Sequence, residues 1–141
     1  MNPTAPAQVV GWLKAAGEAS RLRLLVLCAE GALAVSDLAQ AVRESEPRVS
    51  RHLKILCEAG LLARTREGQW VRYGLADAPG AVSFVRGLML QVDRRHPVLL
   101  RDRAAASALA LPGEGAPAQS SRLDRALRAF VEASGAVAGG G

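Results

Sequence analysis

The side chains best suited to chemistry in this sequence are the cations and hydroxyls between positions 45 and 54. The apolar residues Val49, Leu53 and Leu56 recur at helical spacing, and the cations fall elsewhere around the helix. A helix with an apolar back and an arginine, serine and lysine front suits the major groove of DNA, because these side chains bind phosphates and guanine edges. An ordinary solvated surface helix carries similar charges. The candidate contacts of this stretch are Ser45, Arg48, Ser50, Arg51, His52 and Lys54.

Residues 62–75 read as two short strands joined by a turn at Glu67-Gly68. We expect Leu62, Trp70 and Leu75 to pack inward, and the basic side chains to surround the hairpin tip. Such a hairpin suits a phosphate backbone or a minor groove. A basic helix followed directly by a basic hairpin indicates a winged helix-turn-helix, and it is a more specific signal than either piece alone. The candidate contacts of the hairpin are Arg64, Arg66, Gln69 and Arg72.

Further helices must position these two pieces. The pattern of apolar residues predicts three of them before the recognition helix, and Ser36 is a plausible N-cap of the third. The third helix, a short turn and the recognition helix together form the helix-turn-helix. We therefore predict a mainly α fold with a small two-stranded β wing, in a DNA-binding domain over residues 1–78. The predicted helices span 7–16, 18–29 and 35–42, the recognition helix spans 46–59 and the wing spans 62–75.

Composition limits the partners of the chain. It has 141 residues, a net charge of +5 and a pI of about 10.2, which indicates polyanionic partners. No apolar run approaches the roughly 20 residues that cross a bilayer, and no signal peptide is apparent. We expect a cytoplasmic protein without a membrane partner. No nucleophile–base pair and no cofactor loop is recognisable, so we expect neither an enzyme nor a bound cofactor.

Several linked motifs resemble the ArsR/SmtB family of bacterial dimeric repressors. The resemblance covers about residues 7 to 95 and implies a homodimer, double-stranded operator DNA with approximate dyad symmetry, and an effector that changes DNA binding. An alternative of another class is a winged-helix module that binds protein, which an acidic or apolar recognition face would favour. The motifs are Ala19-Ser20-Arg21-Leu22-Arg23-Leu24-Leu25, Val35-Ser36-Asp37-Leu38-Ala39, Pro47-Arg48-Val49-Ser50-Arg51-His52-Leu53-Lys54-Ile55-Leu56, Glu58-Ala59-Gly60-Leu61-Leu62, Arg66-Glu67-Gly68 and Tyr73-Gly74-Leu75.

The metal sites of the family do not carry over. The family's Cys-Val-Cys pattern corresponds here to Ala34-Val35-Ser36, so both thiolates are missing. Asp77 and Asp93 match two ligands of a second family site, but its histidines are absent. Two carboxylates without imidazole or thiolate make a poor zinc or arsenic site. His96 would be a lone ligand, so we expect no metal site.

Residues 79–110 are expected to form dimerisation and effector helices. The helix over 81–92 is apolar all round, so a second copy of the chain or the chain's own C-terminal part must cover it. A small organic ligand with an anionic group would suit its apolar lining and the nearby arginines. We expect a linker, a final helix and a flexible tail over 111–141. The candidate effector-pocket residues are Phe84, Leu88, Met89, Arg94 and Arg95.

Cys28 and Cys57 allow a rival, thiol-based response. Some persulfide-sensing members of the family pair a cysteine of the second helix with one after the wing. Cys28 resembles the first, but no cysteine follows Cys57. The plainer interpretation of both is a small buried hydrophobic residue.

Overall fold

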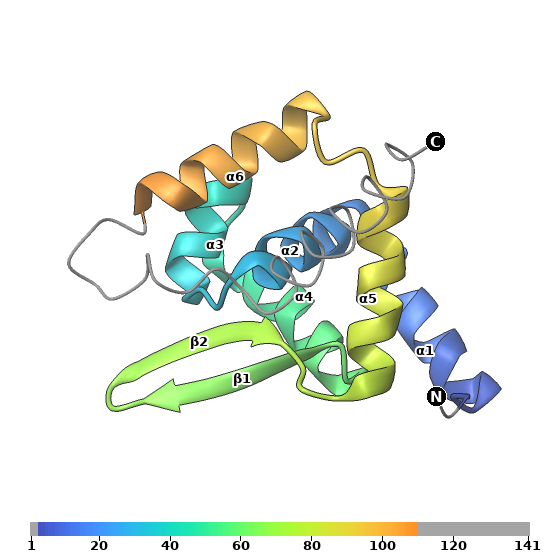
Figure 1. Ribbon diagram of the computed structural model, residues 1–141. Coiled ribbons are helices and arrows are strands. Elements are labelled where there is room, and N and C mark those ends of the chain that lie inside the picture. The colour runs from blue at the N-terminus through green and yellow to red at the C-terminus, as the bar shows by residue number, and fades with distance from the viewer. Residues whose placement is uncertain (1–2, 110–141) are drawn as a thin grey trace, which may run out of the picture.

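The computed structural model describes residues 3–109, which contain six helices and one two-stranded antiparallel sheet (Figure 1). The predicted mainly α fold with a small β hairpin is confirmed. The linker, final helix and tail expected over 111–141 lie outside the described residues. The elements are α1 (Pro6–Ala16), α2 (Ala19–Glu30), α3 (Val35–Val42), α4 (Glu46–Glu58), β1 (Leu62–Glu67), β2 (Trp70–Leu75), α5 (Pro79–Gln91) and α6 (Pro97–Leu109).

Helix α2 is the centre of the fold. Its six consecutive residues from Leu24 to Ala29 are all buried, and the other five helices and the hairpin lie around it (Figure 1). The buried residues Leu38, Val49 and Leu53 bring α3 and α4 into the same core. A helix that is apolar on nearly all sides must be enclosed in this way.

The ends of the helices follow from local capping. The carboxylate of Glu18 accepts a hydrogen bond from the backbone N–H of Arg21 at 2.9 Å and so caps α2. The prediction of Ser36 as the cap of α3 is wrong, because α3 begins at Val35 and the capping position falls on Ala34. Ala34 has no side chain that could accept a hydrogen bond, so the first turn of α3 has no side-chain cap.

Helices α1 and α5 lie side by side at one end of the molecule (Figure 1). The rings of Trp12 and Phe84 join them, with centroids 5.3 Å apart and planes tilted by 41°. Three large apolar side chains of these two helices remain exposed: Val10 by 46%, Leu13 by 54% and Leu90 by 47%. This end of the molecule therefore presents apolar surface that the described chain leaves open.

Helix α6 packs back across α2 and α3 of the same chain (Figure 1). Leu99 and Ala106 are buried in this contact, and so is the carboxylate of Asp102, whose residue is 0% exposed. No helix within residues 3–109 is long and apolar enough to cross a membrane.

Candidate nucleic-acid interface

Helix α4 has defined ends that its sequence sets. The Ser45 hydroxyl accepts a hydrogen bond from the Arg48 backbone N–H at 3.4 Å, and Pro47 lies in the first turn, where no N–H is needed. At the other end Gly60 has a φ of 84°, in the left-handed region that glycine adopts without strain. The N–H groups of Gly60 and Leu61 bond the carbonyls of Cys57 and Leu56, each at 3.0 Å. These two bonds form a Schellman motif, which satisfies carbonyls of the last turn.

The side chains of α4 separate into a buried face and a polar face. Val49, Leu53 and Leu56 are 0% exposed and fix the orientation of the helix on α2. The residues facing solvent include four of the candidate DNA contacts, which are Arg48, Ser50, Arg51 and Lys54. A row of cations and a hydroxyl on one exposed helix face can donate to phosphates and to the acceptor atoms of guanine.

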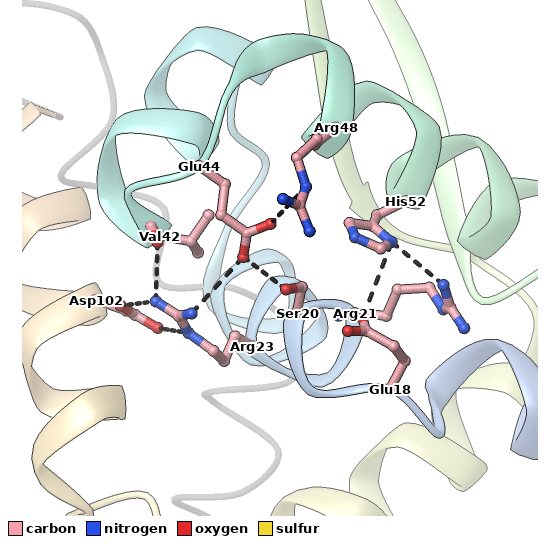
Figure 2. Close-up of polar contacts among 9 residues, drawn as sticks. All are labelled: Glu18, Ser20, Arg21, Arg23, Val42, Glu44, Arg48, His52 and Asp102. Carbon is pink, nitrogen blue, oxygen red and sulfur yellow. Dashed lines mark hydrogen bonds and ion pairs between the residues drawn. The ribbon is translucent and has the colours of Figure 1, made fainter.

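His52 lies apart from that face. Its side chain is 17% exposed, and Nδ1 lies 3.2 Å from a terminal nitrogen of Arg21 and 3.9 Å from the carboxylate of Glu18 (Figure 2). Arg21 is held in turn by the carbonyl of Ala15, to which its Nε donates at 2.6 Å. His52 therefore joins α4 to α2 in the free protein, whereas the other candidates of α4 point to solvent.

The turn before α4 brings a carboxylate to the edge of the interface. Arg43 adopts a left-handed conformation with φ 60°, which ends α3 and redirects the chain. Glu44 then accepts a hydrogen bond from the Ser20 hydroxyl at 2.6 Å, and its other oxygen lies 3.9 Å from Nε of Arg48 (Figure 2). Because Arg48 is 65% exposed, this ion pair is weak and leaves the guanidinium available to another anion.

The hairpin is anchored at its base and projects from the helical body (Figure 1). Leu33, between α2 and α3, forms a bridge to Tyr73 through two backbone hydrogen bonds of 3.0 and 2.8 Å. Glu67 pairs with Trp70, so the turn consists of Gly68 and Gln69, and Gly68 has a φ of 62°. A two-residue hairpin turn requires such a positive φ.

The basic side chains follow this hairpin as predicted for a wing. Arg64, Arg66 and Gln69 are exposed, and Arg72 is half-buried. Nε of Arg66 donates to the carbonyl of Gly68 at 3.2 Å, which ties this side chain to the turn. The two strands therefore carry three arginines and one glutamate between the turn and the base of the hairpin.

The sequence predicted that Trp70 packs inward, and this prediction is wrong. Its side chain is 58% exposed at the hairpin tip, whereas Leu62 is 3% exposed and Leu75 is half-buried. The register explains the difference, because Leu62 pairs with Leu75 and Trp70 lies five residues before Leu75. An odd separation along a strand places two side chains on opposite faces of the sheet.

The sequence reasoning missed an ion pair that fixes the scaffold behind α4. The guanidinium of Arg23 donates to both carboxylate oxygens of Asp102, at 2.8 and 2.9 Å, and to the carbonyl of Val42 at 3.0 Å (Figure 2). The hydrogen bond to Asp102 raises the pKa of Arg23 further, although burial opposes it. The charged residues on α2 and on α6 were visible in the sequence, but no spacing rule joins residues this far apart.

The two cysteines are free thiols, and neither has the environment of a reactive thiolate. Burial raises the pKa of Cys28 strongly, and the nearby Cys57 adds to the shift. Burial also raises the pKa of Cys57, although the positive charge of Arg64 opposes it. Reactive cysteines have lowered pKa values, because the thiolate is the nucleophile.

The candidate effector residues are divided between the core and the surface. Met89 is 4% exposed within the core, Phe84 packs on Trp12, and Leu88 is half-buried. Arg94 donates to the carboxylate of Glu30 at 3.1 Å, and Arg95 is exposed. Within residues 3–109 no three His, Cys, Asp or Glu side chains lie close enough together to hold a metal ion.

Comparison with known proteins identifies relatives of this arrangement. The sequence pattern described as "Bacterial regulatory protein, arsR family" matches residues 19–64. The "HTH-type transcriptional regulator NmtR" of Mycobacterium tuberculosis is 33% identical over 103 residues, which are 69% of this chain and 86% of that regulator. The "Arsenical resistance operon repressor" of Escherichia coli is 42% identical over 64 residues, 45% of this chain. The chain spans 55% of the length of that repressor.

A solved structure has the same architecture. It is the homodimeric winged helix-turn-helix DNA-binding domain of a possible ArsR-family transcriptional regulator from Mycobacterium bovis. The two chains superpose with a TM-score of 0.56 and 26% sequence identity, over 67% of this chain and 93% of that domain.

Proposed function

The chain belongs to the ArsR family of bacterial regulatory proteins, and on that footing we propose that it is a sequence-specific DNA-binding transcriptional repressor. The observation that carries the proposal is the exposed row of Arg48, Ser50, Arg51 and Lys54 on α4, next to a projecting basic hairpin. Helix α4 reads the major groove, and the arginines of the hairpin bind the adjacent sugar–phosphate backbone. A member of the family named as a repressor supports the direction of regulation.

The polar contacts around α4 hold this recognition helix in place before DNA binds. The buried face of the helix, its Ser45 cap and the Glu44–Ser20 hydrogen bond hold its position before DNA arrives. Arg48 then exchanges its weak contact with Glu44 for an acceptor on DNA. Because the helix itself need not reorganise, little of the binding free energy is spent on ordering it.

The protein acts as a homodimer in this proposal. The exposed apolar side chains of α1 and α5 supply the contact surface, and the homodimeric neighbour supports such an assembly. Two copies related by a two-fold axis would place their α4 helices in successive major grooves, about 34 Å apart. The operator then has approximate dyad symmetry.

The effector is a small molecule and not a metal at the usual family sites. Ala34 and Ser36 stand where thiolates would be needed, and the histidines of the second family site are missing from their expected positions near Pro79 and Leu90. We place the effector site on α5 and the following turn, with Phe84, Leu88, Met89, Arg94 and Arg95 as its candidate residues. A response through Cys28 or Cys57 is the rival, and the raised pKa values of both thiols speak against it.

A protein-binding winged-helix module is the alternative from another class. Its recognition face would be acidic or apolar, whereas the exposed face of α4 carries Arg48, Arg51 and Lys54. The charge of this face therefore favours DNA over an average protein surface.

The experiment that tests the proposal is a selection of genomic fragments by the purified protein, followed by footprinting. We expect one recurring site with two protected half-sites about one helical turn apart, and an affinity that falls steeply with salt. Recovery of unrelated fragments with no shared site would reject sequence-specific binding. Failure to retain any duplex at low salt would reject DNA binding altogether.

A further inference from the structure

Trp70 is the most exposed large apolar side chain among residues 3–109, and it lies at the tip of the projecting hairpin. Single exposed apolar residues are common on protein surfaces and need no explanation by themselves. This one differs in its position, because the tip of the hairpin projects beyond the helices (Figure 1). Something other than the described part of the chain must cover the indole if it is to be buried.

The charges around Trp70 indicate the chemistry of that partner. On its own face of the hairpin, Thr65 and Arg72 form the next cross-strand pair, and Glu67 lies directly opposite. Arg66 follows on the other face, with its guanidinium tied to the turn. On the face of Trp70 the charges of Arg72 and Glu67 balance, and Arg66 on the other face makes the hairpin tip net positive, which favours an anionic partner.

We propose that Trp70 is a DNA-contacting residue that packs its indole against the sugar–phosphate wall of the groove beside the one read by α4. The inference rests on the proposed function and extends it to a residue that carries no charge. An indole combines a large apolar face with one N–H donor, so it can cover a deoxyribose and donate to a phosphate together. Apolar side chains also contact DNA in other minor-groove binders, where they insert between base steps.

The contact should be separable from the arginine contacts by its salt dependence. Replacing an arginine that binds a phosphate lowers the slope of log affinity against log salt by about 1. Trp70→Ala removes no charge, so it should weaken binding at every salt concentration and leave the slope unchanged. We expect a loss of about tenfold for Trp70→Ala, which corresponds to ~1.4 kcal/mol, and a loss of less than ~3-fold for Trp70→Phe.

Tryptophan fluorescence tests the contact directly, because the sequence contains only two tryptophans. Trp12 is 4% exposed, so in the wild type acrylamide should quench mainly Trp70, and Trp12→Phe makes Trp70 the single reporter. We expect a mixed-sequence duplex at low salt to shift the Trp70 emission to shorter wavelength and to protect the indole from quenching by acrylamide. Both changes should follow the same titration curve as the anisotropy of the labelled DNA. If Trp12→Phe does not fold, the quenching titration of the wild type gives the same answer.

Leu100→Ala is the matched control, since Leu100 is 47% exposed on α6, away from the hairpin. Duplex binding with an unchanged Trp70 signal and wild-type affinity of Trp70→Ala would overturn the inference and leave the proposed function standing. A Trp70 signal that changes with protein concentration in the absence of DNA would also overturn it, because the indole would then contact a second copy. No binding of any duplex by the wild type would overturn both.

Discussion

Arg23 of α2 and Asp102 of α6 form a two-pronged ion pair, with donor–acceptor distances of 2.8 and 2.9 Å, although 79 residues separate them in sequence. The same guanidinium donates to the carbonyl of Val42 at the end of α3. This arginine of α2 therefore joins α6 to the end of α3, the first helix of the helix-turn-helix (Figure 2). The pair fixes α6 on the DNA-binding core of its own chain.

Removing one partner of this pair should destabilise the protein strongly. Asp102→Ala leaves the Arg23 guanidinium, which is only 20% exposed, without its main acceptor. Loss of one member of a buried pair typically costs about 3–5 kcal/mol. Chemical denaturation should show this loss, whereas Arg101→Ala, on the exposed side of α6, should change the stability by less than ~0.5 kcal/mol.

The double variant Arg23→Met/Asp102→Leu removes both charges of the pair and keeps apolar side chains in their place, so it separates the effect of charge from the effect of volume. It should recover much of the stability lost in Asp102→Ala, because both charges of the Arg23–Asp102 pair are then absent. If the Asp102→Ala protein unfolds at the same denaturant concentration as the wild type, the structural role of the pair is contradicted.

Glu18 should make the stability depend on pH in the acidic range. Burial raises the pKa of Glu18, but hydrogen bonds from the Arg21 and Ser20 backbone and the charges of His52 and Arg21 outweigh it, so the net pKa lies below the ordinary 4.5. The ionised carboxylate therefore stabilises the fold above pH 4.5, and this contribution is lost as the pH falls through the lower, folded-state pKa.

Glu18→Gln should reduce that acid-side slope, with a loss near neutral pH of only ~0.5 kcal/mol, since the side chain is 37% exposed and solvent screens its charge. Denaturant midpoints measured from about pH 3 to about pH 7 test this. Parallel curves for Glu18→Gln and the wild type would refute the assignment.

The dimer surface can be tested with one buried-charge variant. Leu13 of α1 is 54% exposed, and a carboxylate there would have to be desolvated in the proposed interface. Leu13→Glu should sediment as a monomer at micromolar concentration, whereas Leu100→Glu, on α6, should remain a dimer. A monomeric wild type, or a Leu13→Glu protein that is still dimeric, would exclude α1 from the contact.

The thiol alternative predicts a response that the proposed effector site does not. With both pKa values raised by burial, Cys28 and Cys57 should react slowly with iodoacetamide at neutral pH and faster under alkaline conditions. A Cys28→Ser/Cys57→Ser protein should keep its response to the inducing signal. If oxidants release the wild type from DNA and leave this variant bound, the thiol model replaces the effector site.

The elements of the fold could be predicted from the sequence because their signals are local. The spacing of Val49, Leu53 and Leu56, the Ser45 cap and Gly60 together define α4 within a residue. The inward packing expected of Trp70 conflicts with the strand period, because its odd separation from Leu75 places the two side chains on opposite faces of the sheet. The pairing of Arg23 with Asp102 depends on how α6 folds back, which no local pattern reports. His52 likewise lies at the border between the two faces of α4, and only the position of Arg21 turns it inward.

The most direct test of the central claim is the affinity of the Arg51→Ala/Lys54→Ala protein for the selected operator, measured by fluorescence anisotropy across a salt series. Both side chains are exposed on α4, and Arg101→Ala on α6 removes an exposed cation away from α4, the hairpin and the proposed dimer surface as the control. We predict that the double variant loses about 1–3 kcal/mol of binding free energy for each of the two side chains that reads a base. For each side chain that instead binds a phosphate, the slope of log affinity against log salt should become shallower. Wild-type affinity and an unchanged salt slope in the double variant would contradict the assignment of α4 as the helix that reads DNA.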